Sequence, residues 1–221
     1  PKKGMLSVGV ARQYCGQLGK RANCQSLVSL TLAQGEVPVP VGLRLFLPDE
    51  WVADAGRCAR AGVPEAATLD DAPRSKGEIA LAELDRVAAA GARFGCVLAD
   101  AGYGTSAAFR HALDKRGLQW AMGVARNQKV YNKDVQLVTP GGRARKPVPD
   151  REPEAAEDVL AALPWRRVTW RNGTKGKLHA RFAAIRVRVA DGATWANNRH
   201  LPGKEAWLVG EWRTSGERKY Y

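Results

Sequence analysis

The stretch from Phe94 to Val124 constrains the fold of this chain more than any other. It holds a short apolar run at 94–99, a segment with helical spacing at about 106–115 and a second apolar run at 119–124. Apolar runs of this length are typical of buried strands, and Gly117 is a natural stop for the helix between them. The order strand, helix, strand predicts a βαβ unit, in which the two strands lie parallel in one sheet.

The segments before this unit predict a hairpin and a helix. Residues 23–33 and 39–47 alternate apolar and polar side chains, as half-buried strands do, and a turn at 34–36 joins them. Residues 51–75, which include several prolines and the Asp70-Asp71 pair, predict a loop with short helical turns at most. A helix is expected at 76–90, where apolar residues recur at helical spacing.

The pattern changes after residue 126. Residues 137–164 predict an exposed linker with one short helix at 154–163, because this segment is rich in proline and glycine. Within it lie a Gly141-Gly142 pair and a basic cluster of Arg143, Arg145 and Lys146. Strands are expected at 165–171, 178–189 and 206–213. These strands suggest a β-rich insertion into an α/β frame.

The charge of the chain favours a polyanionic partner. The chain carries 35 Lys and Arg against 22 Asp and Glu, which gives a formal net charge of +13. Such an excess suits nucleic acid, because neutralising phosphates releases condensed counterions. We find no apolar run of about 18 residues and no basic amphipathic helix, so a membrane partner is not expected. Cys15, Cys24, Cys58 and Cys96 show no metal or disulfide spacing and are expected to be free thiols.

Residues 97–104, VLADAGYG, join a predicted strand to a predicted helix through an acidic residue and two glycines. One interpretation is a phosphate cradle, because Gly102, Gly104 and Ala107 fit the GxGxxA pattern of dinucleotide sites. Such a site also needs an acidic residue at the end of the next strand to bind the ribose, and residues 119–126 contain none. A nucleotide-binding α/β enzyme is therefore the weakest alternative.

The other interpretation makes Asp100 a metal ligand. A carboxylate at the carboxyl end of a buried parallel strand lies where open α/β sheets bind ligands, and a charge there is costly unless it is paired or coordinated. Gly102 and Gly104 would then allow a sharp turn and the close approach of nucleic acid. Asp100 equally suits a structural role, as the cap of the following helix or as a turn residue. Spacing alone leaves both roles open.

Four segments of the chain resemble bacterial insertion-sequence transposases of the DDE superfamily. They are PKKGMLSVGVARQYCGQLGKRANCQ at 1–25, LFLPDEW at 45–51, VLADAGYG at 97–104 and WRNGTKGKLHARFAAIRVR at 170–188. They follow the order found in that family and are spread over nearly the whole chain.

The resemblance implies a ribonuclease-H-like core whose three acidic residues hold two divalent ions, Mg²⁺ or Mn²⁺. These ions promote in-line attack on a phosphodiester and stabilise the leaving oxygen. The second acidic residue of the family corresponds to Asp100, and the first and last are expected outside residues 1–221. Glu211, in the apolar segment WLVGEW, is expected to be structural or exposed. We therefore expect the parent protein to be an enzyme and this chain alone to be inactive.

The basic and aromatic residues predict contacts with double-stranded DNA, both transposon ends and target DNA. The candidates are Lys2, Lys3, Arg12, Tyr14, Lys20, Arg21, Tyr103, Arg166, Arg171, Lys175 and Lys177. Cations suit phosphates and aromatic rings suit bases, although solvated loops and strand cores contain the same residue types. The alternative function is a non-catalytic DNA-binding remnant of a transposase. The resemblance also implies a location in the bacterial cytoplasm, at the nucleoid, and leaves a homodimer open.

The expected fold class is α/β, with a ribonuclease-H-like mixed sheet, flanking helices and a β-rich insertion. Residues 1–126 are expected to form the core, whose first strand is truncated. Residues 127–205 are expected to form the insertion, and 206–221 the start of the return to the core.

Overall fold

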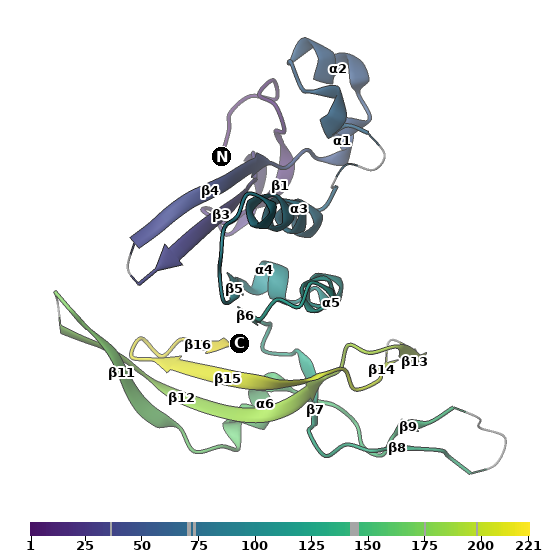
Figure 1. The fold of residues 1–221 in the computed structure, drawn as a ribbon, viewed down its shortest axis with the longest axis vertical. Coiled ribbons are helices and arrows are strands. Elements are labelled where there is room, and N and C mark those ends of the chain that lie inside the picture. Colours follow the sequence, from purple (N-terminus) through teal and green to yellow (C-terminus); the bar gives the residue numbers. More distant parts are fainter. Residues whose placement is uncertain (36, 70–71, 73, 142–145, 175, 198) are drawn as a thin grey trace. The chain divides into compact units, whose positions relative to one another are not determined.

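A computed structural model of the chain describes residues 1–35, 37–69, 72, 74–141, 146–174, 176–197 and 199–221. The described residues form two compact units, Pro1–Gly95 and Cys96–Tyr221 (Figure 1). Several residues singled out above lie outside the described part: Glu36, Asp70, Asp71, Gly142, Arg143, Arg145 and Lys175.

Two antiparallel hairpins begin the first unit. β3 (Leu27–Gln34) pairs with β4 (Val37–Leu45), which confirms the hairpin predicted at 23–47. The second hairpin, β1 (Ala11–Cys15) with β2 (Lys20–Cys24), was not expected. Its sequences, ARQYC and KRANC, are short and lack a clear apolar alternation, so the strand signal is weak.

Helices complete the first unit. Two short helices, α1 (Asp49–Val52) and α2 (Ala55–Arg60), and a 3₁₀ turn at Glu65–Ala67 occupy the predicted loop. The longer α3 (Lys76–Ala89) confirms the predicted helix and packs on the β3–β4 hairpin. Its Glu83 is buried, and Arg86 and Arg44 neutralise it at 2.7 and 3.4 Å. Since Arg44 belongs to β4, this cluster holds the helix on the hairpin.

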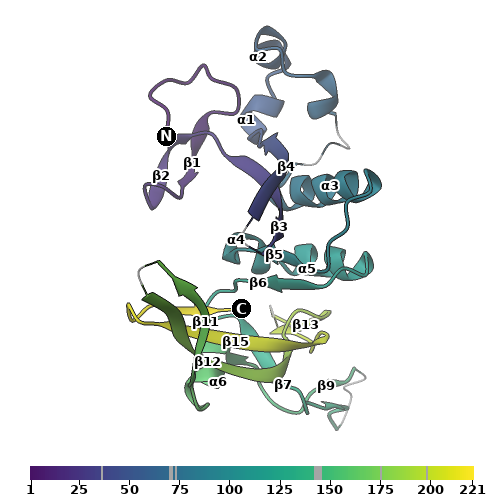
Figure 2. The same ribbon diagram turned by 60° about the vertical axis from the view of Figure 1, so that its left-hand side comes forward.

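The second unit starts with the predicted βαβ unit. β5 (Val97–Ala99) and β6 (Trp120–Met122) pair in parallel, and α4 (Ala101–Gly104) and α5 (Ala107–Lys115) connect them (Figure 2). α4 lies directly on the backbone that follows β6. A Cβ atom at Gly104 would overlap the carbonyl oxygen of Gly123, and one at Gly123 would lie 2.9 Å from the backbone nitrogen of Ala101. These glycines therefore permit close packing of backbone on backbone.

A six-stranded antiparallel sheet forms most of the second unit. Its strands lie in the order β10-β7-β12-β15-β16, and β11 also pairs with β12. Their bounds are β7 (Lys129–Asn132), β10 (Glu154–Ala155), β11 (Arg166–Gly173), β12 (Gly176–Val189), β15 (Glu205–Arg213) and β16 (Arg218–Tyr220). Three of them, β11, β12 and β15, confirm predicted strands, and Figure 1 shows these three side by side. The chain is thus a mixed α/β protein with a multi-stranded sheet.

The core of the second unit lies between this sheet and α6 (Ala156–Ala161). Ala156 and Leu160 of the helix are fully buried against Val130, Ala183 and Leu208 of three strands. The helix falls within the predicted 154–163. The predicted linker is otherwise more structured than expected, because it contains β10 and a small hairpin of β8 (Leu137–Val138) with β9 (Val148–Pro149).

Two further pairings complete the second unit. β13 (Thr194–Ala196) and β14 (Arg199–His200) form a short hairpin. Near the end of the described chain, the backbone nitrogen of Val124 donates to the carbonyl oxygen of Tyr220 at 2.8 Å, in an isolated antiparallel bridge. This bridge ties the segment after β6 to β16. All four cysteines are free, as expected.

The start of α3 yields a prediction about pH. Ser75 and Glu78 form a capping box, in which Glu78 Oε2 accepts from the backbone nitrogens of Ser75 and Arg74 at 2.8 and 2.9 Å. Hydrogen bonds from these backbone groups lower the pKa of Glu78. Its stabilising effect is therefore fully present above the unfolded-state pKa of about 4.3 and is lost as the pH falls through the folded-state pKa. We expect Glu78→Gln to destabilise the protein at neutral pH and to match the wild type in acid.

Chemical denaturation at several pH values measures this difference. Ser75→Ala is the matched control, because it removes the other half of the box without removing a titratable group. It should lower the free energy of unfolding by about 1 kcal/mol, with a weaker dependence on pH than Glu78→Gln, because the Ser75 side chain accounts for only part of the lowering of the Glu78 pKa. An effect of Glu78→Gln that stays constant down to acid pH would contradict the assignment.

The contact between Gly104 and Gly123 yields a second prediction. Gly104→Ala should lower the free energy of unfolding by about 2 kcal/mol, because the added methyl group overpacks the α4–β6 junction. Alanine favours a helix over glycine by about 1 kcal/mol, so a net loss reports the clash itself. Gly141→Ala in the same unit is the control, since its Cβ position has nothing within 4 Å. Equal unfolding midpoints for the two variants would contradict this prediction, because they would show that the α4–β6 junction accommodates the methyl group without loss of stability.

Candidate functional site

Asp100 follows β5 directly and caps α4. Its Oδ1 accepts a hydrogen bond from the backbone nitrogen of Gly102 at 2.9 Å, and its backbone is extended. The side chain is exposed, so the carboxylate remains accessible from solvent. The structural role left open by the sequence is therefore present, and it leaves the acidic group in a position that a cation can reach.

The two glycines beside Asp100 differ in their surroundings, because Gly102 is exposed and Gly104 is buried. Gly104 is buried against Gly123, and α4 continues through the predicted turn as one helical turn. The interpretation that Gly104 admits a nucleic-acid strand is therefore wrong. Tyr103 packs its ring on Phe109, with 5.3 Å between the ring centroids. Burial, and then the charge of Asp100, raise the pKa of Tyr103.

A buried ion pair behind the turn was not visible in the sequence. Arg110 of α5, 2% exposed, donates to the carbonyl oxygen of Gly104 and lies 2.6 Å from Asp191 Oδ2. His111 Nε2 lies 3.4 Å from the same carboxylate oxygen. Arg110 and Asp191 are 81 residues apart, so no local sequence pattern predicts their contact. The pair anchors α4 and α5 to the segment that follows β12, and hence fixes where Asp100 stands within this unit.

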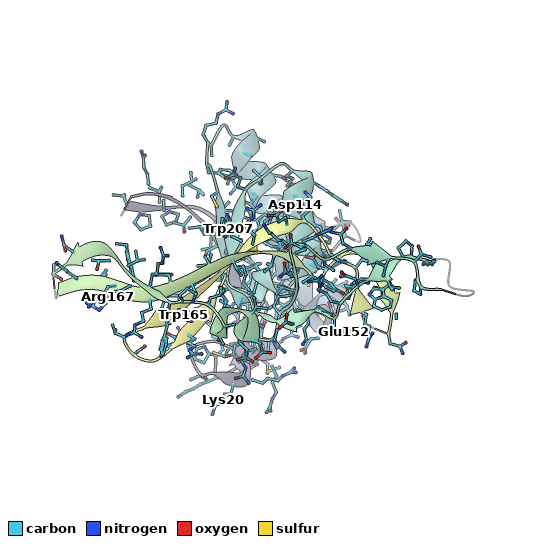
Figure 3. All side chains as sticks on the ribbon, turned by 90° about the horizontal axis from the view of Figure 1, so that it is seen from below. Lys20, Asp114, Glu152, Trp165, Arg167 and Trp207 are labelled. Carbon is cyan, nitrogen blue, oxygen red and sulfur yellow. The ribbon has the colours of Figure 1, made fainter. Side chains whose placement is uncertain are left out.

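A cavity of about 1140 Å³ lies between α5, β6 and the β12–β15 face of the sheet. Its lining includes Asp114 and Trp207, which Figure 3 labels. Most of its charges are already paired: Asp114 lies 3.3 Å from Lys204, and Arg186 lies 2.6 Å from Glu205. The cavity therefore offers apolar walls and compensated charges rather than a reactive group.

The described residues do not make a complete metal site. Among them, no three His, Cys, Asp or Glu side chains form a group that could hold an ion. Asp100 supplies one exposed carboxylate, which is a suitable oxygen ligand for Mg²⁺ or Mn²⁺. One carboxylate does not fit a two-ion centre, and no catalytic step through a metal follows from the described residues.

Glu211 has a structural role, as expected. It is buried, and its carboxylate receives hydrogen bonds from Arg213 Nε at 2.9 Å and from the Tyr221 hydroxyl at 2.7 Å. Burial by itself would raise the pKa of Glu211, but these two bonds and the nearby cations hold it below its usual value. Burial and the same carboxylate raise the pKa of Tyr221 to about 12. The carboxylate of Glu211 is thus occupied by hydrogen bonds within the protein.

The N-terminal candidates for DNA contact come together on the β1–β2 hairpin. Tyr14 and Arg21 lie opposite each other in the register, as do Cys15 and Lys20. Arg12, Tyr14, Lys20 and Arg21 are exposed, as are Lys2 and Lys3 before the hairpin. Tyr14 exposes 64% of its surface. The hairpin therefore presents cations beside an accessible ring.

The other candidates lie on the β11–β12 hairpin. Arg166, Arg171 and Lys177 are exposed, whereas Lys175 falls outside the described residues. Trp170 is 53% exposed and contacts Phe182 edge to face. Trp165, which Figure 3 labels, packs over Gly210 and against Trp212. Only one of these two tryptophans is thus placed to meet a partner.

The histidines take local roles. His200 Nδ1 lies 3.0 Å from the carbonyl oxygen of Gly192, and His179 contacts Arg167 and the carbonyl oxygen of Lys177. In the part of the chain that the structure describes, no helix is long and apolar enough to cross a membrane.

Comparison with known protein families gives a match over most of the chain. The family described as DDE superfamily endonuclease matches residues 1–177. No curated protein and no solved structure matches the chain. The matched span covers both hairpins of the first unit, the βαβ unit with Asp100 and the start of β12. The chain therefore belongs to the DDE superfamily endonucleases, as a transposase-like domain.

Proposed function

We propose that the chain acts in DNA transposition, in the cutting and joining of transposon ends by hydrolysis and transesterification of phosphodiesters. Endonuclease domains of this superfamily act on DNA and generally use divalent metals. The observation that carries the proposal is the family match over residues 1–177 together with the exposed carboxylate of Asp100 after a parallel strand. The net charge of +13 supports a polyanionic substrate.

Asp100 is proposed as the catalytic carboxylate of this chain and as one oxygen ligand of Mg²⁺ or Mn²⁺. When bound, two such ions would supply Lewis-acid stabilisation of the attacking and leaving oxygens. The hydrogen bond from Gly102 to Oδ1 fixes the direction of the carboxylate. The junction of Gly104 with Gly123 and the ion pair of Arg110 with Asp191 hold the turn that carries it.

The finer fold assignment is also a proposal. Residues 1–126 would form a ribonuclease-H-like core, 127–205 a β-rich insertion and 206–221 the return to the core. The parallel pair β5–β6, with α4 and α5 between its strands, supports the first part. The bridge between Val124 and Tyr220 supports the last part, because it joins the end of the proposed core to β16. β15 and β16 also belong to the sheet of the proposed insertion.

The DNA surface is proposed to include the exposed cations of the N-terminal segment and the β1–β2 hairpin, and Arg166, Arg171 and Lys177 of β11–β12. Arginine and lysine would contact phosphates, and the exposed ring of Tyr14 would stack on a base. Tyr103 is a weaker candidate, because its ring already packs on Phe109. The proposed setting is the nucleoid of a bacterial cytoplasm, with transposon ends and target DNA as partners and a homodimer left open.

Two measurements test this proposal. Duplex DNA should bind the chain with an affinity that falls steeply between about 50 and 200 mM salt. In NMR spectra, Mn²⁺ should broaden the backbone amides of Ala101 and Gly102, and Asp100→Asn should abolish this effect. Asp54→Asn is the control, because Asp54 caps α2 through a hydrogen bond from the backbone nitrogen of Arg57 at 2.7 Å. That variant should leave the broadening near Asp100 unchanged.

The outcomes separate the alternatives. Salt-sensitive DNA binding without Mn²⁺ broadening at Asp100 would favour a non-catalytic DNA-binding protein, which the lack of a three-ligand group among the described residues also allows. Saturable NAD binding without DNA binding would favour a nucleotide-binding enzyme and would refute the proposal.

A further inference from the structure

Four side chains form a line across the large sheet. Arg167 of β11 lies directly opposite Arg181 of β12, Arg181 lies opposite Trp212 of β15, and Trp212 lies opposite Arg218 of β16. Residues directly opposite each other on neighbouring strands share one face of a sheet. We name Arg167, Arg181, Trp212 and Arg218 the arginine row. Figure 3 labels its first member on the β11–β12 hairpin.

The guanidinium groups of the row are held in place. Those of Arg218 and Arg181 lie 4.4 and 5.5 Å from the ring centroid of Trp212. Arg167 Nη2 lies 3.0 Å from His179 Nε2, and His179 Nδ1 lies 3.1 Å from the carbonyl oxygen of Lys177. This network assigns the proton to Nδ1, so that Nε2 accepts from Arg167. Arginine is thus pre-oriented at three positions of the row.

The row is electrostatically unfavourable by itself. Like charges directly opposite each other on neighbouring strands destabilise a sheet. Among the residues that the structure describes, no carboxylate lies within ion-pair distance of any of the three arginines. The nearby Glu211 and Glu217 pair instead with Arg213 and Lys219. An anion is the partner that would remove this repulsion.

A pocket of about 360 Å³ opens at the row. Arg167, His179, Arg181 and Trp212 line it, with Arg213 and Thr214 at its side. The planar guanidinium group matches a phosphate through two parallel hydrogen bonds. Strands lie about 4.8 Å apart, so the row is about 14 Å long, which is the axial rise of about four nucleotides in one strand of a DNA duplex.

We propose that the arginine row binds the phosphate backbone of DNA without regard to base sequence. This rests on the proposed function, because it takes DNA as the substrate of the chain. Trp212 is a positioning residue, since its ring is occupied by guanidinium groups and is not free to stack on a base. The row lies on the opposite face of β11 from Arg166, because successive side chains of a strand point to opposite faces. Of the other cations inferred from the sequence, Lys177 lies on the same face of β12 as Arg181.

The test compares arginines of the row with Arg186, an arginine of β12 outside the row. Arg181→Gln and Arg167→Gln each remove one cation of the row. Arg186→Gln is the matched control, because Arg186 lies on the other face of β12, 5.1 Å from the ring centroid of Trp207, and pairs with Glu205 at 2.6 Å. Binding of the full 221-residue chain to unrelated duplexes is measured by fluorescence anisotropy over a range of KCl concentrations. Far-UV circular dichroism confirms that each variant is folded.

We expect Arg181→Gln and Arg167→Gln each to weaken binding by about tenfold, which is what one charge-assisted hydrogen bond is worth. The slope of log affinity against log salt should fall by about 1 in each variant, equally for all duplex sequences. Arg186→Gln should match the wild type. Arg181→Lys should keep the slope, because it keeps the charge, while losing the bidentate geometry.

Trp212→Ala distinguishes positioning from stacking. If Trp212 positions the cations, the salt slope falls as it does in Arg181→Gln. A loss of affinity at constant slope would instead overturn the positioning role. Wild-type protein that binds no duplex would refute the proposed function and this inference together. Salt-sensitive wild-type binding, with the row variants indistinguishable from Arg186→Gln, would refute the inference alone.

Discussion

The pairing register of β12 is the constraint on which the second unit depends. This strand pairs with β7, β11 and β15, so one choice of register places its residues in three ladders at once. Alternate side chains enter the core with Leu160, as Ala183 and Val187 do. A shift by one residue would send these side chains to the opposite face and bury charged ones instead. The register of β12 therefore determines which residues form the core, which line the cavity and which form the arginine row.

Charge is distributed in two ways over this protein. Some cations are neutralised where they meet buried groups, as Arg110 is by Asp191 and Arg86 by Glu83. Removing one partner of such a buried pair would leave an uncompensated charge, which is strongly destabilising. Other cations lie on exposed strands, where no carboxylate of the described residues neutralises them, as with Arg167 and Arg181. These unneutralised, exposed cations account for the net charge of +13 that would attract a polyanion.

Much of the fold was predictable because its signals are local. The β3–β4 hairpin, α3, the βαβ unit, α6 and the strands β11, β12 and β15 all follow from the period of their apolar residues. The hairpins β1–β2, β8–β9 and β13–β14 were missed. Strands of two to five residues contain too few side chains to show an alternation of apolar and polar residues.

The candidate site shows the same division. The sequence by itself placed Asp100 after a parallel strand, because a short apolar run, a glycine turn and a helix are read along one segment. It also determined the excess of cations and the superfamily to which the chain belongs. Only the tertiary structure decided that Gly104 packs on Gly123 and that Arg181 meets Trp212. Such contacts depend on the register between strands, and many registers are compatible with the same local pattern until the whole sheet is assembled.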